Sequence, residues 1–234
     1  MRPVTKNLIV VPCFNEAKRW NDDYWRSMTS IPETHWLFVS DGSTDATSKL
    51  IESFIGLMES EQHHVSFLNL ERNMGKGEAI RQGWLAQKSL NFESIGFLDA
   101  DGAFNRNDIE QLIARYQELV SNGDFDAIWS SRVALSGRNI ERHASRHYIG
   151  RLVATFLSFG GHPLPYDTQS GLKLFKASPE LWRTLEIPFS TRWLFEIETL
   201  THYQGLIGTP LQVWEMPLDY WVDVPGSKIG LAES

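Results

Sequence analysis

The chain has 234 residues, of which 42% are hydrophobic and 22% charged, and its formal net charge is −7. This length and composition predict a well-packed core without disulfide or metal staples, and the acidic balance argues against general nucleic-acid binding. The single cysteine, Cys13, cannot form an intrachain disulfide, which fits a reducing compartment, and we expect it to be a packing residue at the end of a strand.

Strand and helix signals alternate along the first half of the chain. Short apolar runs indicate buried strands, and periodic segments, one of them with Thr44 as N-cap, indicate helices. The predicted order is strand 8–11, helix 16–30, strand 36–39, helix 44–58, strand 65–70, helix 78–89, strand 95–98, helix 107–120 and strand 127–129. This repetition predicts an α/β fold with a mostly parallel central sheet and helices on both faces.

The second half is less regular. Residues 132–151 are rich in Arg and His, a break follows at Pro163-Leu164-Pro165, and the pattern predicts a strand at 171–175, a helix at 193–203 and a strand-like segment at 213–221. Because no linker separates the halves, we expect a single domain spanning residues 1–234.

Polar motifs follow four of the predicted strands. They are Asn15-Glu16, Asp41-Gly42-Ser43, Asn73 to Gly77, and Asp99-Ala100-Asp101. Ligands of such sheets bind beyond the carboxyl ends of the strands, so these motifs predict one shared site.

The Asp-x-Asp motif is the strongest of these. Carboxylates two residues apart at the end of a strand point to the same face, and Mg²⁺ and Mn²⁺ prefer oxygen ligands and commonly share phosphate oxygens of a substrate. Asp99 and Asp101 therefore indicate a metal that acts as a Lewis acid on a leaving phosphate. The alternative is a solvated loop with a turn at Asp101-Gly102.

The other strand-end motifs also have two interpretations. Asp41 could accept hydrogen bonds from a base or a ribose, or simply belong to a turn before a helix. Glu16 could line a ligand or only stabilise a helix N-terminus. The loop from Asn73 to Gly77 could bring N–H groups and Lys76 towards phosphates, although it lacks the spacing of a Walker A loop, or it could be a plain helix entry.

Positive charge gathers in the second half, in Arg132, Arg138, Arg142, Arg146 and Arg151. These arginines could dock an anionic substrate or form a solvated helix face, and Arg132, directly after a strand, is the best candidate. His143 and His147 lack a third metal ligand and are expected to lie at the surface or beside the acceptor.

Two further polar segments could contribute to the site. The segment Asp167-Thr168-Gln169-Ser170-Gly171 could lie under a ligand. Glu196 and Glu198, two residues apart on a predicted helix, should face different ways, so at most one points into the site.

Taken together, these residues resemble family 2 glycosyltransferases of the GT-A fold, and in particular the dolichyl-phosphate glucosyl- and mannosyltransferase branch. The matching segments occur in family order at 11–16, 40–45, 73–77, 99–102, 131–132, 167–175, 195–198 and 225–228. The resemblance implies that residues 1–130 bind a nucleotide sugar and that residues 131–234 form the acceptor side.

The resemblance also implies roles for individual residues. Asp99 and Asp101 would hold Mg²⁺ or Mn²⁺, with water or phosphate completing the coordination, because Ala103 stands where many mannosyltransferases carry a glutamine. Donor contacts are implied for Pro12, Phe14, Asn15, Glu16, Asp41, Gly42, Ser43, Lys76, Asp99, Ala100, Asp101, Arg132 and Gln169. Acceptor-phosphate contacts are implied for Arg138, Ser227 and Lys228.

The implied reaction is inverting transfer of a hexose from a UDP-sugar or GDP-mannose, with glucose from UDP-glucose preferred, to a polyprenyl or dolichyl phosphate. The alternative acceptor is a glycan hydroxyl in surface polysaccharide synthesis, for which Asp167 or Glu196 would be the general base. A non-catalytic nucleotide-sugar-binding module is the third interpretation. Nucleotidyl transfer is disfavoured because Pro12 to Lys18 lacks a long Gly-rich Arg-Lys loop.

The expected location is cytoplasmic. No signal peptide is visible, and the longest apolar stretch, 152–159, is far shorter than the about 20 residues of a membrane span. If the acceptor is a lipid, the protein would lie at a membrane surface or bind a membrane partner protein.

Overall fold

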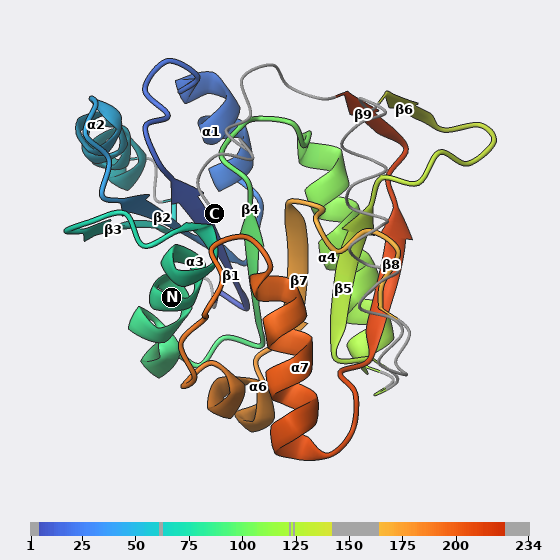
Figure 1. Ribbon diagram of the computed structural model, residues 1–234. Coiled ribbons are helices and arrows are strands. Elements are labelled where there is room, and N and C mark those ends of the chain that lie inside the picture. Colours follow the sequence, from blue (N-terminus) through green and yellow to red (C-terminus); the bar gives the residue numbers. More distant parts are fainter. Residues whose placement is uncertain (1–4, 61–62, 122, 124, 142–163, 223–234) are drawn as a thin grey trace.

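A seven-stranded sheet forms the centre of the molecule, with strand order β3-β2-β1-β4-β7-β5-β8 (Figure 1). The computed structural model describes residues 5–60, 63–121, 123, 125–141 and 164–222. The strands are β1 (Asn7–Cys13), β2 (Thr34–Asp41), β3 (Val65–Leu70), β4 (Ser94–Leu98), β5 (Ala127–Ser131), β7 (Leu172–Lys176) and β8 (Val213–Pro217). Only β7 runs antiparallel to its neighbours in this sheet, β4 and β5, so the predicted mostly parallel sheet is confirmed.

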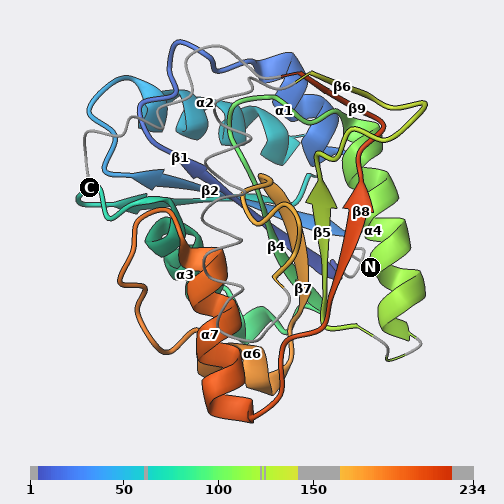
Figure 2. The ribbon, with the colours of Figure 1, turned by 45° about the vertical axis from the view of Figure 1, so that its right-hand side comes forward.

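Helices cover both faces of this sheet (Figures 1 and 2). One face carries α1 (Asp22–Thr29), α2 (Thr47–Ser60) and α4 (Arg106–Ser121). The other carries α3 (Lys76–Ala86), α6 (Pro179–Thr184) and α7 (Phe195–Ile207), with a short 3₁₀ turn, η1 (Lys88–Leu90), after α3. Side chains alternate along a strand, so β1 gives Ile9 and Val11 to the first core and Leu8 and Val10 to the second.

The first strand runs further than its apolar segment predicted. Pro12 lies inside β1, where a missing N–H would normally cost a ladder hydrogen bond. Pairing of β1 with β4 ends at Val10, so Pro12 pairs with β2 alone. Cys13 is fully buried in the first core, and burial raises the pKa of its thiol, which confirms it as a packing residue.

Two predicted helix starts are wrong. The helix expected from Glu16 begins at Asp22, because Asn21 is its N-cap and accepts a hydrogen bond from Tyr24 N at 3.0 Å. The helix expected from Thr44 begins at Thr47, whose backbone N–H donates to Asp45 Oδ1 at 2.9 Å.

The second half also differs in detail. The strand-like segment 213–221 is two strands, because the extended structure is interrupted at Leu218-Asp219. The first strand, β8, joins the main sheet. The second, β9 (Tyr220–Val222), pairs with β6 (Asn139–Glu141) in a small second sheet. The helix expected at 193–203 is α7, and α6 was not predicted. Among the described residues, no helix has the length and apolarity to cross a bilayer.

Candidate functional site

A lysine–aspartate pair marks the carboxyl edge of β4. Lys76, the first residue of α3, places its Nζ 2.6 Å from Oδ1 of Asp99, which directly follows β4. The backbone N–H of Asp99 donates to the carbonyl of Gly171 at 2.9 Å. A Cβ on Gly171 would lie 2.3 Å from Asp99 Oδ2, so a glycine is required for the carboxylate to sit there.

Asp101 adds a second carboxylate beside this pair. Its Oδ1 accepts a hydrogen bond from Ala103 N at 3.1 Å. Burial, followed by the negative charge of Asp99, raises the pKa of Asp101 above its ordinary value. Burial also raises the pKa of the nearby Tyr24 phenol, and the charge of Asp101 adds to that effect. The two carboxylates repel one another in a partly desolvated place, and a bound cation would relieve that repulsion.

The residues present fit a magnesium or manganese ion. Asp99 and Asp101 offer the carboxylate oxygens that these ions prefer. Within the described parts of the chain, no group of three or more His, Cys, Asp or Glu side chains could hold a metal alone. Water or a substrate phosphate stays the predicted source of the remaining ligands of such an ion.

Lys76 is held as an ammonium ion. Burial disfavours its charge, but the carboxylates of Asp99 and Glu196 outweigh burial and raise the pKa of Lys76. The ammonium also lies 5.2 Å from the centre of the Phe97 ring. Lys76 thus binds Asp99, and its contact with a phosphate stays a prediction.

Asp41 ties two strand-end loops together. Its Oδ1 accepts from Met74 N at 2.7 Å and its Oδ2 from Gly75 N at 2.9 Å. Burial raises the pKa of Asp41 in spite of these bonds. The prediction that this loop aims its N–H groups at phosphates is therefore wrong for these two, because Asp41 takes them. Gly42, with φ of 62°, is needed because a Cβ there would lie 2.3 Å from the backbone of Arg72.

Hydrogen bonds also join the loop after β1 to the loop after β2. Asn15, with φ of 52°, accepts from Thr44 N at 2.8 Å through its side chain. The backbone N–H of Asn15 donates to Ser43 Oγ at 3.1 Å. Two of the predicted donor contacts, Asn15 and Ser43, therefore lie side by side at this edge of the sheet.

Glu16 belongs to the same junction. Its backbone N–H donates to Thr47 Oγ1 at 2.7 Å, and its carboxylate accepts a hydrogen bond from Arg19 Nε at 2.8 Å. The alternative that Glu16 stabilises a helix N-terminus is wrong, because α1 begins only at Asp22. Two other predicted donor contacts, Phe14 after β1 and Ala100 after β4, are both half-buried.

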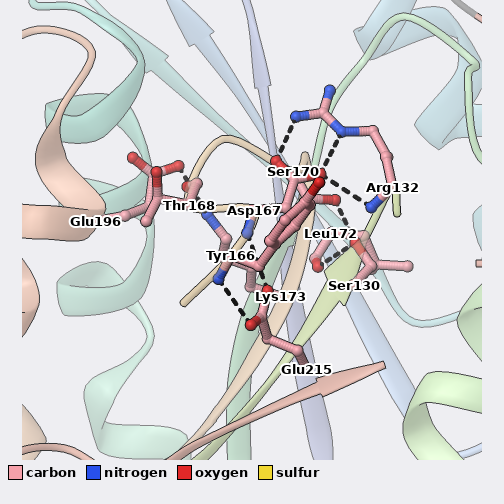
Figure 3. A network of polar contacts seen from close by, with 10 residues as sticks. All are labelled: Ser130, Arg132, Tyr166, Asp167, Thr168, Ser170, Leu172, Lys173, Glu196 and Glu215. Carbon is pink, nitrogen blue, oxygen red and sulfur yellow. Dashed lines mark hydrogen bonds and ion pairs between the residues drawn. The ribbon is translucent and has the colours of Figure 1, made fainter. Parts of the chain in front are cut away.

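Arg132, which is half-buried, and Asp167, which is buried, form a bidentate pair (Figure 3). Arg132 Nε lies 2.8 Å from Oδ2 and Nη2 lies 2.7 Å from Oδ1 of Asp167, and Arg132 N also donates to Oδ2 at 2.9 Å. The carboxylate of Glu215 accepts the backbone N–H groups of Tyr166 and Asp167. With three donors from Arg132 on its carboxylate, Asp167 is poorly suited to the predicted task of general base.

The two glutamates of α7 face different ways, as predicted. Glu196 is 1% exposed and bound to Lys173. Glu198 instead accepts the backbone N–H groups of Ser190 and Thr191. Glu196 is therefore too buried to act as a base for an acceptor.

Of the predicted acceptor-phosphate contacts, Arg138 is the one that the structure describes. Arg138 is paired with Asp219, in the turn between β8 and β9. The predicted residues Ser227 and Lys228 lie outside the described residues. The same holds for the arginines and histidines from Arg142 to Arg151.

Gln169 lies two residues after Asp167, the partner of Arg132. It is half-buried, and its Nε2 is buried with no hydrogen-bond partner among the described residues. A buried amide nitrogen without a partner is costly, so Gln169 is a candidate for contact with a ligand.

The individual roles of two residues, Lys173 and Gly171, were not predicted, although both lie in the segment 167–175 that the sequence analysis singled out. Lys173 stands in the apolar strand Leu172-Lys173-Leu174-Phe175 and is fully buried. A lysine inside a strand that is buried on both faces is a sign of a specific partner. Gly171, just before that strand, could have been recognised as a place where backbone and side chain approach closely.

Known proteins are similar to this chain over most of its length. The glycosyl transferase family 2 model matches residues 8–182. The dolichyl-phosphate beta-glucosyltransferase of Mus musculus is 32% identical over 96% of this chain and 70% of its own length. The dolichyl-phosphate beta-glucosyltransferase of Saccharomyces cerevisiae is 28% identical over 96% of this chain and 69% of its own length. The chain thus spans about two thirds of the length of these relatives.

Solved structures share the fold. A mannosyltransferase from Pyrobaculum calidifontis in complex with GDP-Man and Mn²⁺ superposes with a TM-score of 0.61 at 15% identity, covering 96% of this chain and 59% of that one. Glucosyl-3-phosphoglycerate synthase from Mycobacterium tuberculosis, with Mn²⁺ and UDP, gives 0.60 at 16% identity, covering 94% and 73%. These likenesses confirm the expected GT-A fold.

Proposed function

The chain belongs to glycosyl transferase family 2, and on that basis we propose that it moves a hexose from a nucleotide sugar to a dolichyl- or polyprenyl-phosphate acceptor. The preferred donor is UDP-glucose. The name of the mouse relative supports both the sugar and the acceptor, at modest identity over nearly the whole chain. The carboxylate pair at the end of β4 is the observation that carries the proposal.

Asp99 and Asp101 would hold Mg²⁺ or Mn²⁺. Such an ion, when bound, neutralises charge on the diphosphate leaving group. Two solved structures of the same fold contain Mn²⁺, which supports metal use. Lys76 lies beside these carboxylates and supplies a second positive charge at the same edge.

The reaction needs no general base if the acceptor is a phosphate. An anionic phosphate oxygen attacks the anomeric carbon, a new carbon–oxygen bond forms, and the bond to the diphosphate breaks with inversion. Both predicted bases are held by cations in the structure: Asp167 by Arg132 and Glu196 by Lys173. This favours the phosphate acceptor over a hydroxyl acceptor, which would have to lose a proton.

The two halves of the chain and its location belong to the same proposal. Residues 1–130 would bind the donor and residues 131–234 would face the acceptor. The protein would work in the cytoplasm, at the surface of a membrane that carries the lipid phosphate.

Transfer of labelled sugar from a panel of donors tests this function. The donors are UDP-glucose, UDP-galactose, UDP-GlcNAc and GDP-mannose, with Mn²⁺, and the acceptors are dolichyl phosphate and an oligosaccharide. We expect glucosylated dolichyl phosphate that disappears on chelation. Asp101→Asn should lose this activity, whereas Glu110→Gln, in an exposed ion pair on α4, should keep it.

Two results would reject the proposal. Transfer to the oligosaccharide but not to dolichyl phosphate would establish the hydroxyl-acceptor alternative. Metal-dependent donor binding without any transfer would establish a binding module.

A further inference from the structure

A fully buried ion pair lies between the main sheet and α7. Lys173 Nζ, in β7, is 2.9 Å from Glu196 Oε1, in the first turn of α7, and the two side chains are 0% and 1% exposed. The ammonium also lies 4.3 Å from the centre of the Trp129 ring. Burying two charges carries a large desolvation cost, and an apolar pair of similar size often makes a protein at least as stable. A role beyond stability would explain why this position holds an ion pair.

The lysine holds a particular backbone carbonyl. Lys173 Nζ donates to Thr168 O at 2.5 Å, in the segment from Tyr166 to Ser170 (Figure 3). Other contacts fix the rest of this segment: Arg132 binds Asp167, and Ser130 Oγ lies 2.5 Å from Ser170 Oγ. Thr168 is thus the point at which the ion pair and the segment meet.

One aromatic ring lies next to both this ion pair and the Lys76–Asp99 pair. The Phe97 ring lies 5.2 Å from Lys76 Nζ and 5.4 Å from Lys173 Nζ, so both ammonium groups flank one aromatic side chain. Lys76 binds Asp99 at 2.6 Å, whereas Lys173 binds Glu196 and Thr168 O. The Phe97 ring is therefore the common contact of the Lys76–Asp99 pair and the Lys173–Glu196 pair.

We propose that Lys173 and Glu196 are positioning residues that fix the Tyr166–Ser170 segment relative to the Lys76–Asp99 pair. This inference rests on the proposed function. Gln169, with its buried unpaired nitrogen, lies in the positioned segment and would meet the sugar, while Asp99 would meet the metal. A misplacement of about 1 Å between such groups can cost about 100-fold in rate.

A double variant separates positioning from stability. Lys173→Met/Glu196→Met removes both charges together, so no buried charge is left without a partner, and methionine suits the neighbouring aromatic rings. We expect a melting temperature near that of the parent, but Thr168 O loses its donor. Backbone amides of residues 166–170 should exchange at least ~10-fold faster with deuterium, and kcat should fall ~10- to 100-fold. KM for UDP-glucose should change less than about threefold, because Asp41, the proposed contact of the base or ribose, lies at the end of β2 and not on this segment.

A second buried ion pair is the matched control. Glu78 and Arg81 on α3 are 2.7 Å apart and nearly as buried, and Arg81 donates its remaining hydrogen bond to Leu185 O, away from the Tyr166–Ser170 segment. Glu78→Met/Arg81→Met should leave amide exchange of residues 166–170 and kcat at parent values. If Lys173 and Glu196 have a merely structural role, their double variant should also keep parent values of amide exchange at residues 166–170 and of kcat. That result would overturn the inference.

Two further measurements keep the test decisive. If the double variant does not fold, the near-isosteric Glu196→Gln should show faster amide exchange at residues 166–170 and a lower kcat, both at smaller amplitude, because an amide cannot balance the charge of Lys173. Parent values of the exchange rate and of kcat would reject the positioning role. If the parent protein transfers no sugar at all, the proposed function fails, whereas the exchange measurement still decides whether the ion pair holds the segment.

Discussion

A methyl group at Gly171 should displace Asp99, a proposed metal ligand, without unfolding the protein. In Gly171→Ala the new Cβ would lie 2.3 Å from Oδ2, 2.4 Å from Cγ and 2.9 Å from Cβ of Asp99. Because even the Asp99 Cβ is too close, a rotation of the carboxylate alone does not relieve the overlap. Either Asp99 leaves Lys76, to which it is bound at 2.6 Å, or the backbone bond from Asp99 N to Gly171 O lengthens.

The size of the effect follows from that overlap. Inserting a methyl group into a packed site costs about 1–3 kcal/mol, which lowers the melting temperature of a chain of this length by roughly 2–12 °C. The functional loss follows from the displaced carboxylate and is separate from this loss of stability. A carboxylate displaced by about 1 Å costs on the order of 100-fold in metal-dependent transfer.

The assay compares manganese binding in the presence of UDP, followed calorimetrically, with glucosyl transfer to dolichyl phosphate. Gly205→Ala, in α7, is the matched control, because a Cβ there meets no atom within 4 Å. Alanine in a helix is favoured over glycine by about 0.5–1 kcal/mol, so this control should be slightly more stable and fully active. Parent-like manganese affinity and turnover in Gly171→Ala would refute the reasoning.

Three other substitutions have expected outcomes. Asp101→Asn should raise the free energy of unfolding of the metal-free protein by about 0.5–2 kcal/mol and abolish transfer. Because the pKa of Asp101 is raised in the folded protein, its charged carboxylate opposes folding fully above that pKa, and this effect fades as pH falls towards the pKa of the unfolded chain. The difference in stability between parent and variant should therefore shrink in acid, and a constant difference would contradict this. Asp41→Ala should lower the unfolding free energy in urea by about 2–4 kcal/mol, because it leaves two backbone N–H groups without an acceptor, and a loss below about 0.5 kcal/mol would show that water replaces them. Asp167→Asn should lower kcat as much as Arg132→Met does and leave the pH–rate profile unchanged, whereas a change in the shape of that profile would restore Asp167 as a base.

Local sequence is enough to locate the sheet and the edge at which the site lies. Apolar runs locate β1, β2, β4 and β5, because strands that are buried on both faces are mostly apolar along their length. The pair Asp99 and Asp101 could be recognised as candidate metal ligands from spacing alone, since oxygen chemistry and alternation along a strand are local properties.

Which charges are available, by contrast, depends on the packed fold. Asp167 and Glu196 look like free carboxylates in the sequence, but Arg132 and Lys173, distant along the chain, bind them. Long-range pairing also decides that β7 runs antiparallel to β4, and it places Gly171 so close to Asp99 that a larger residue would overlap the carboxylate. Local propensity carries no information on contacts between residues far apart in the chain. The order of residues therefore indicates which groups gather at the edge, and only their three-dimensional arrangement reveals which of them are already bound to one another.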